Sequence, residues 1–245
     1  MRQVPETEHS YLIVGNGRLA KHLTRYLALL NIPFQHYTRQ SSQPFSEFLL
    51  GVSRVLLLIS DRAIEDFIKE HKTSANENCI WIHCSGLHSS KLAESAHPLA
   101  SFSDVLFDLD FYQSIPFVTE KGRIPFSTLL PGLPNPHIAI DQSEKELYHA
   151  MCVLSGNFTT ILWMEFEKYL SEKLNANKPV MLPYLKSISH NLEFSADPLT
   201  GPLKRKDHST IERHYKSLEG SPLKDIYSSF VKFYATKNPT HENRN

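Results

Sequence analysis

The 245-residue sequence has few cysteines, no excess of either charge and no long apolar run. Its cysteines, Cys79, Cys84 and Cys152, include no Cys-x-x-Cys pair, which argues against a disulfide framework and against a zinc site. Lys plus Arg and Asp plus Glu both number 26, so no net charge draws the chain to nucleic acid or to an anionic membrane. No apolar run approaches the roughly 20 residues of a membrane helix, and the polar N-terminal segment lacks the apolar core of a signal peptide. We therefore expect a cytoplasmic protein with no metal, nucleic-acid or membrane partner.

Two patterns divide the sequence near residue 140. Before that point, short apolar runs alternate with helical segments, and the runs are continuously apolar. Such runs favour strands that are covered on both faces, as in a parallel sheet with crossover helices. The predicted strands are 11–15, 33–39, 54–59, 79–84 and, more weakly, 96–102, 114–118 and 137–141, and the predicted helices are 17–30, 60–70 and one that begins at Ser89.

After residue 140 the sequence predicts helices alone. Apolar residues recur every three or four positions from Leu147 to Leu162, which predicts a long buried helix with a bend at Gly156. A last helix is predicted from Pro222 to about residue 236. We therefore expect an α/β fold in two parts, a mostly parallel sheet domain at 1–140 and an all-α domain at 141–245.

A Gly-x-Gly-x-x-Ala run follows the first predicted strand. Gly15 permits a sharp turn out of the strand, Gly17 lets the backbone approach a pyrophosphate, and Ala20 lets the next helix pack against the strand. The free N–H groups of that helix then face the phosphates. A plain glycine turn is the alternative, but the position between a strand and a helix favours a dinucleotide site in a Rossmann-like domain. The predicted contacts in this run are Gly15, Asn16, Gly17, Arg18, Leu19 and Ala20.

The end of the second predicted strand indicates which dinucleotide is bound. No acidic residue occurs between positions 31 and 46, where an NAD site places a carboxylate for the ribose hydroxyl. Arg39 can instead pair with the 2′-phosphate of NADP, although a solvated charge at the strand end is the alternative. We therefore expect NADP as the cofactor. The hydroxyl groups available as further donors are those of Thr38, Ser41, Ser42 and, after the third strand, Ser60.

Several longer phrases resemble a known group of proteins. They are LIVGNGRLAKHL (12–23), HCSGLHSSKL (83–92), AHPLASF (96–102), YHAMCVLSGNF (148–158) and DPLTGPLKRKDHSTIERHYKSL (197–218). They resemble the little-characterised family that joins an N-terminal Rossmann-like NADP-binding domain to a C-terminal helical domain of unknown function. That family is similar in turn to pyrroline-5-carboxylate reductase, ketopantoate reductase and the 6-phosphogluconate dehydrogenase group. The resemblance implies that the helical domain often dimerises and that the active cleft lies between the domains.

Two turns and one helix supply candidate catalytic groups. Ser85 follows the fourth predicted strand and can hydrogen-bond the nicotinamide or the substrate, while His83 is an acid, a base or a buried imidazole. His97 precedes a proline, which favours an extended backbone, and the pair resembles the His-Pro turn of prephenate dehydrogenase relatives, where the histidine lies close to substrate and nicotinamide. His97 can therefore supply the proton that accompanies hydride transfer, unless it is structural. Asn157 either binds the substrate or cofactor amide or forms a bond between helices.

A basic segment in the second half is the candidate substrate site. Lys204 and Arg205, with Asp207 to orient one of them, can bind a carboxylate or phosphate, unless they form a solvated surface. The resemblance implies a glycine before this aspartate, where the chain has Lys206. This departure puts the geometry of the turn in doubt.

These features lead to the hypothesis of an NADP-dependent oxidoreductase that moves a hydride between the nicotinamide and a small carbonyl, imine or hydroxy compound. The related dehydrogenases use a lysine midway along the first long helix, whereas the only lysine over 142–165 is Lys145, in its first turn. Either histidine replaces that lysine or the chemistry differs. A non-catalytic NADP-binding sensor or assembly protein is the main alternative, and a nucleotide-sugar or nucleoside-phosphate binder is a weaker one. We expect a small-molecule substrate, with an anionic group, and a homodimer.

Overall fold

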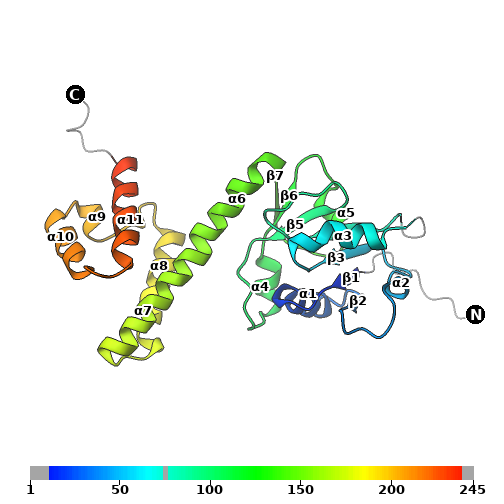
Figure 1. Cartoon of the computed structure of the whole chain (residues 1–245), viewed down its shortest axis with the longest axis horizontal. Coiled ribbons are helices and arrows are strands. Elements are labelled where there is room, and N and C mark those ends of the chain that lie inside the picture. Colours follow the sequence, from blue (N-terminus) through cyan, green and yellow to red (C-terminus); the bar gives the residue numbers. More distant parts are fainter. Residues whose placement is uncertain (1–10, 74–76, 239–245) are drawn as a thin grey trace, which may run out of the picture. The chain divides into compact units, whose positions relative to one another are not determined.

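The computed structural model describes residues 11–73 and 77–238. The chain divides into two compact units, residues 1–162 and 163–245, and Figure 1 labels their elements. The first unit contains all the strands of the described residues, and only helices follow the last strand. The predicted domain boundary after residue 140 is the point where the sheet ends. The first unit continues beyond it because the next helix contacts the sheet through Lys145 and Tyr148.

The first unit is built on a seven-stranded sheet in the order β2-β1-β3-β4-β5-β6-β7. Neighbouring strands are parallel except β5 and β6, which are antiparallel. This arrangement confirms the predicted α/β class with a mostly parallel sheet. The strands are β1 (Tyr11–Val14), β2 (Phe34–Tyr37), β3 (Arg54–Leu57), β4 (Ile80–His83), β5 (Glu94–Pro98), β6 (Phe117–Glu120) and β7 (His137–Ile140).

Side chains from both faces of the sheet are buried, as the continuously apolar strands predict. Along β1, Tyr11 and Ile13 pack into one core cluster and Leu12 and Val14 into another, because successive side chains of a strand point to opposite faces. All four side chains are at most 2% exposed. The helices of this part are α1 (Arg18–Leu29), α2 (Phe45–Phe48), α3 (Asp61–His71), α4 (Leu109–Ser114) and α5 (Phe126–Leu129).

The helix predicted from Ser89 is not formed, and this segment runs as turns and bends into β5. Side chains bind its backbone groups in place of helical hydrogen bonds. Arg123 donates to the carbonyl oxygens of Ser90 and Ala93 at 3.3 and 2.7 Å, and the Ser90 hydroxyl accepts from the Ala93 N–H group. The prediction was wrong because Arg123 comes from a distant part of the chain, which local sequence does not reveal.

A continuous helical run follows the sheet. It begins with a short 3₁₀ turn (Gln142–Glu144) and continues as α6 (Lys145–Cys152), a π-helical segment (Val153–Phe158) and α7 (Thr159–Leu174). Gly156, where a bend is predicted, lies within the π-helical segment. The helix is not buried as predicted, because periodicity identifies an apolar face but not an element that covers it. Five of its apolar residues are 48–62% exposed in the single chain, namely Leu147, Met151, Leu154, Phe158 and Ile161.

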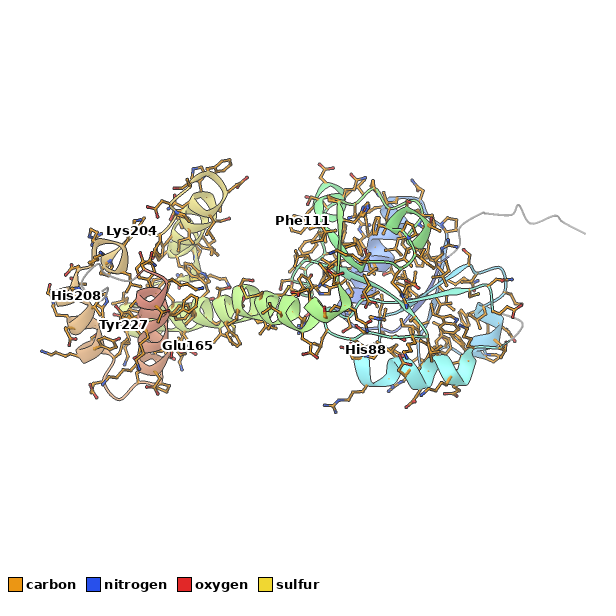
Figure 2. The ribbon with its side chains drawn as sticks, turned by 90° about the horizontal axis from the view of Figure 1, so that it is seen from above. His88, Phe111, Glu165, Lys204, His208 and Tyr227 are labelled. Carbon is orange, nitrogen blue, oxygen red and sulfur yellow. The ribbon has the colours of Figure 1, made fainter. Side chains whose placement is uncertain are left out.

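The second unit is helical and buries few side chains. Ile211 is 8% exposed, whereas Phe233 is 63% exposed. Tyr227, labelled in Figure 2, lies 2.9 Å from His214 Nδ1 and joins two of the helices. Within the described ranges, no helix combines the length and the apolar character needed to cross a membrane. After α7 come a 3₁₀ turn (Lys178–Val180), α8 (Leu182–Phe194), α9 (Pro202–Arg205), α10 (His208–Ser217) and α11 (Leu223–Lys237).

Candidate functional site

The Gly-x-Gly-x-x-Ala run forms the turn between β1 and α1. Gly15 has a φ of +122°, and a Cβ atom there would lie 2.2 Å from the Leu58 carbonyl oxygen. Only glycine therefore fits between the ends of β1 and β3. Gly17 precedes α1 and has no side chain to cap the helix, so the N–H groups of its first turn face outward for an anion.

A cavity of about 500 Å³ lies beside this turn. Its walls come from the glycine turn and from the residues that follow β2 and β3. These are the carboxyl ends of three adjacent parallel strands, at the point where the strand order reverses. Arg39 is the one charged side chain among its described lining residues. The predicted cofactor contacts that the structure brings together here are Asn16, Gly17, Thr38, Arg39 and Ser60.

The other predicted cofactor contacts lie around this cavity and not in its lining. The Ser41 hydroxyl accepts from the Thr38 N–H group at 3.0 Å and holds the turn after β2. Arg18 is largely exposed, with its Nε atom 3.9 Å from Asp104. Leu19 and Ala20 pack against the core, which fixes α1 on the sheet.

A histidine that the sequence reasoning missed braces the glycine turn. His36 Nε2 donates to the Gly15 carbonyl oxygen at 2.6 Å. The Gly15 N–H group donates in turn to the Tyr37 carbonyl oxygen at 3.0 Å. Because β1 and β2 are parallel and Val14 lies opposite Tyr37, these bonds join the ends of both strands. The only available signal was the position of His36 within the second predicted strand, three residues before Arg39.

His83 lies in the core and not in a cavity. Its side chain is fully buried, and neither ring nitrogen has a hydrogen-bond partner among the described residues. Burial, followed by the charges of Lys145, His88 and Arg123, lowers the pKa of His83 to about 3. Of the roles considered from the sequence, the structure favours a neutral buried imidazole.

Ser85 links the turn after β4 to α3. Its hydroxyl donates to Asp61 Oδ2 at 2.6 Å and accepts from the His88 N–H group at 2.9 Å. The Nε2 atom of His88, which is labelled in Figure 2, lies 3.3 Å from Oε1 of Glu65, and Glu65 is on α3 like Asp61. Ser85 therefore shapes this turn, and Asp61 is a partner that the sequence reasoning did not identify.

His97 lies on β5 beside α6. Its Nδ1 atom is 2.7 Å from the Tyr148 hydroxyl oxygen, and its ring centroid is 6.3 Å from that of His149. Burial, followed by the charges of His149 and Lys145, lowers the pKa of His97 to about 4, while Asp61 acts in the opposite direction. His97 is therefore neutral at pH 7 in this structure.

A second cavity, of about 290 Å³, brings two predicted catalytic residues together. His97 and Asn157 both line it, with His149 and Cys152 between them along the chain. Asn157 is exposed on the π-helical segment, an irregularity that is common at functional sites. No lysine or arginine is among the described residues that line this cavity.

Lys145 is held in a buried ion pair. Its Nζ atom lies 2.8 Å from Glu120 Oε1 on β6 and 2.8 Å from Ser95 Oγ on β5, and it also donates to the His88 carbonyl oxygen. Lys145 and Glu120 are 3% and 7% exposed. Burial lowers the pKa of Lys145, whereas the bond to Glu120 opposes this effect. With three acceptors for its three N–H groups, Lys145 holds α6 on the sheet.

The basic segment of the second unit is a solvated turn. Lys204, labelled in Figure 2, pairs with Asp197, and both side chains are exposed. Asp207 was predicted to orient a basic side chain, but among the described residues it forms no ion pair with one. It caps α10 by accepting from the Thr210 hydroxyl at 2.7 Å and from the Thr210 N–H group at 3.0 Å, and these bonds lower its pKa to about 2. Lys206 has a φ of +55°, the left-handed conformation that glycine adopts most easily. The position therefore keeps the backbone geometry that a glycine favours.

Residues 120–233 match the family model described as "Domain of unknown function (DUF2520)". Over these residues, slightly less than half of the chain, the protein is similar to that family. The DUF2520 region begins at the end of β6 and includes the helical run and most of the second unit. It supports the resemblance found in the sequence. No curated protein matches this sequence.

Several solved structures share the fold over nearly the whole chain. A proposed NADP oxidoreductase from Bacteroides fragilis superposes with a TM-score of 0.74 at 18% identity, covering 93% of this chain and 98% of that chain. A protein from Thermotoga maritima has a TM-score of 0.69 at 20% identity, covering 92% and 98%. A reductive aminase from Aspergillus terreus, in complex with NADPH and ethyl levulinate, has a TM-score of 0.60 at 10% identity, covering 94% of each chain. At these identities the likeness shows a common fold.

Proposed function

We propose that this protein is an NADP(H)-dependent oxidoreductase that transfers a hydride between the nicotinamide and a small carbonyl, imine or hydroxy compound. The observation that carries the proposal is the cavity at the carboxyl ends of β1, β2 and β3, where the glycine turn and Arg39 meet. Proteins of the same fold include a proposed NADP oxidoreductase and a reductive aminase that binds NADPH. Both observations support the same cofactor.

The cofactor is held, in this proposal, by groups of two kinds. The N–H groups at the start of α1 bind the pyrophosphate, which Gly17 allows to come close to the backbone. Arg39 binds the 2′-phosphate, with the Thr38 hydroxyl as a second donor. The described lining of the cavity contains no carboxylate to accept a ribose hydroxyl or to repel the phosphate. NADP is therefore favoured over NAD.

Replacing Arg39 by alanine is expected to weaken NADPH binding by about 10- to 100-fold, because a charge-assisted hydrogen bond contributes roughly 1.5–3 kcal/mol. NADH has no 2′-phosphate, so its affinity is expected to stay unchanged. Fluorescence titration of both nucleotides measures the difference. Lys21→Ala, which removes an exposed cation of α1 beyond the cavity lining, is the matched control. Equal affinities of the wild type for NADPH and NADH contradict the assignment of Arg39.

The chemistry is proposed to take place beside His97. When bound, NADPH would supply a hydride to the carbon of C=O or C=N, and a protonated His97 would give its Nε2 proton to the oxygen or nitrogen. The reverse reaction returns that proton to His97 as the hydride leaves the substrate. Asn157 lines the same cavity and can orient the substrate.

The cavity lined by His97 and Asn157 favours an enzyme over the non-catalytic alternative, because it offers space for a substrate beside the histidine. An anionic substrate group bound by Lys204 and Arg205, and a homodimer, stay predictions.

Reduction of keto acids, cyclic imines or aldehydes is expected to consume NADPH, and His97→Ala is expected to lower kcat by about 100-fold. The affinity for NADPH is expected to stay unchanged.

Because the pKa of His97 is lowered to about 4, its protonated fraction falls about tenfold per pH unit above that value. Reduction by the wild type should therefore accelerate as the pH is lowered from 7 to 5, while oxidation, which needs neutral His97, should not. Tight NADPH binding without turnover of any compound supports the non-catalytic alternative.

A further inference from the structure

We propose that Tyr148 is a positioning residue for His97, an inference that rests on the proposed function. Its hydroxyl oxygen binds the Nδ1–H group of His97 and leaves Nε2 as the nitrogen that exchanges a proton with the substrate. Tyr148 does not contact the reacting atoms in this proposal. It acts by fixing the orientation and the tautomer of the imidazole.

The contact between the two rings is short and well oriented. The Tyr148 hydroxyl oxygen lies 2.7 Å from His97 Nδ1, and the rings meet edge to face with centroids 5.6 Å apart. Tyr148 lies one helical turn after Lys145, whose buried bonds to Ser95 and Glu120 fix the start of α6 on the sheet. The hydroxyl is therefore presented to His97 from a rigid part of the molecule.

The opposite side of the imidazole faces the turn after β4. A Cβ atom on Gly86 would lie 3.1 Å from His97 Nε2 and 2.8 Å from His149 Cδ2. Because residue 86 is glycine, it places no side chain against Nε2, and the His149 ring borders the same space. This space is at the carboxyl end of β4, the edge where open parallel sheets bind their ligands. Tyr148 thus binds Nδ1 of His97, and the other ring nitrogen, Nε2, lies next to the edge of the sheet where ligands bind.

The acid–base cycle of His97 requires one particular tautomer. A histidine that gives and takes a proton at Nε2 must keep its other proton on Nδ1 when it is neutral. The Tyr148 oxygen accepts from Nδ1–H in both protonation states and so stabilises this arrangement. The charged or titratable groups that act on His97 are His149 and Lys145 from α6 and Asp61 from α3. Burial and the neighbouring Cys152 raise the pKa of Tyr148, so the tyrosine keeps its own proton.

Tyr148→Phe tests the proposal because it removes the oxygen and retains the ring. Nitrogen-15 NMR at neutral pH, with the His97 signals assigned by comparison with His97→Gln, reports which ring nitrogen carries the proton. The wild type is expected to carry it on Nδ1, and Tyr148→Phe is expected to shift His97 towards the Nε2–H tautomer. The kcat of reduction is expected to fall about tenfold or more, with unchanged NADPH affinity.

Tyr227→Phe is the matched control, because it breaks a similar His–Tyr bond, to His214 in the second unit. It is expected to leave both the His97 tautomer and kcat unchanged. A wild-type His97 with its proton on Nε2 overturns the proposal, and so does a tautomer that Tyr148→Phe does not alter. The NMR measurement does not depend on turnover. Failure of the proposed function, seen as an absence of turnover, is therefore distinguishable from failure of this inference.

Discussion

Gly15→Ala is expected to destabilise the first unit by about 2–6 kcal/mol, the sum of a strained backbone and an overpacked contact. The backbone at Gly15 has a φ of +122°, which other residues rarely adopt. The added methyl group would also lie 2.2 Å from the Leu58 carbonyl oxygen. That contact would push apart β1 and β3, which are joined there by the Leu58 N–H bond to Val14. Urea denaturation of the full chain measures the loss.

Gly17→Ala is the matched substitution, two residues further along the same turn. No atom lies within 4 Å of a Cβ built on Gly17, and its φ of −78° suits any residue. We expect the fold to be unchanged and the stability to fall by only about 0.5–1 kcal/mol, because alanine is a poorer helix N-cap than glycine. NADPH binding is expected to weaken by about tenfold, or about 1.4 kcal/mol, because a methyl group then projects towards the pyrophosphate.

The two glycines therefore separate a structural role from a ligand-binding role. Unchanged NADPH affinity in Gly17→Ala would show that the pyrophosphate does not approach this backbone, and the proposed cofactor site would lose its main support. A Gly15→Ala protein as stable as the wild type would show that the ends of β1 and β3 can move apart without cost.

Lys145→Met is expected to destabilise the protein by about 3–5 kcal/mol, because it leaves the Glu120 carboxylate buried without its partner. Glu120 is 7% exposed, and its remaining hydrogen bond is from Ser89 at 3.2 Å. The substitution also removes the donor to Ser95 and to the turn before β5. The free energy of unfolding, from urea denaturation, measures the effect.

Two further variants distinguish a buried charge from a loss of packing. Lys145→Met combined with Glu120→Leu removes both charges, and we expect it to be more stable than Lys145→Met alone. Lys121→Met breaks the exposed pair with Asp141, whose atoms are 2.7 Å apart, and is expected to cost about 1 kcal/mol or less. If the double variant is no more stable than Lys145→Met, the missing lysine chain, and not the orphaned carboxylate, causes the loss.

Much of the first unit was predictable because its signals are local. Each of the seven strands overlaps a predicted one, and β1, β3 and β4 had the clearest signal, since a strand covered on both faces is apolar at consecutive positions. The glycine turn and Arg39 were predictable as parts of one cavity, the proposed cofactor site, because parallel strands end at a common edge of the sheet. The family match over 120–233 supports the helical half of the resemblance.

The features that the sequence did not predict depend on contacts between distant parts of the chain. The segment after Ser89 is a turn because Arg123 binds its carbonyl oxygens, and Lys145 is unavailable for chemistry because Glu120 and Ser95 hold it. His97 was identified from its neighbour Pro98, but its partner Tyr148 lies 51 positions away. No local pattern encodes such pairs.

The sequence alone determined the strands of the first unit, their mostly parallel arrangement and the chemistry of the turn at Gly15 and Gly17, because strand periodicity and glycine conformations depend on near neighbours. The tertiary structure decided which polar groups are free to react. It buries His83, engages Ser85 with Asp61 and binds one nitrogen of His97. Burial and hydrogen bonding set the charge and the tautomer of a side chain, and both arise only when distant segments pack together.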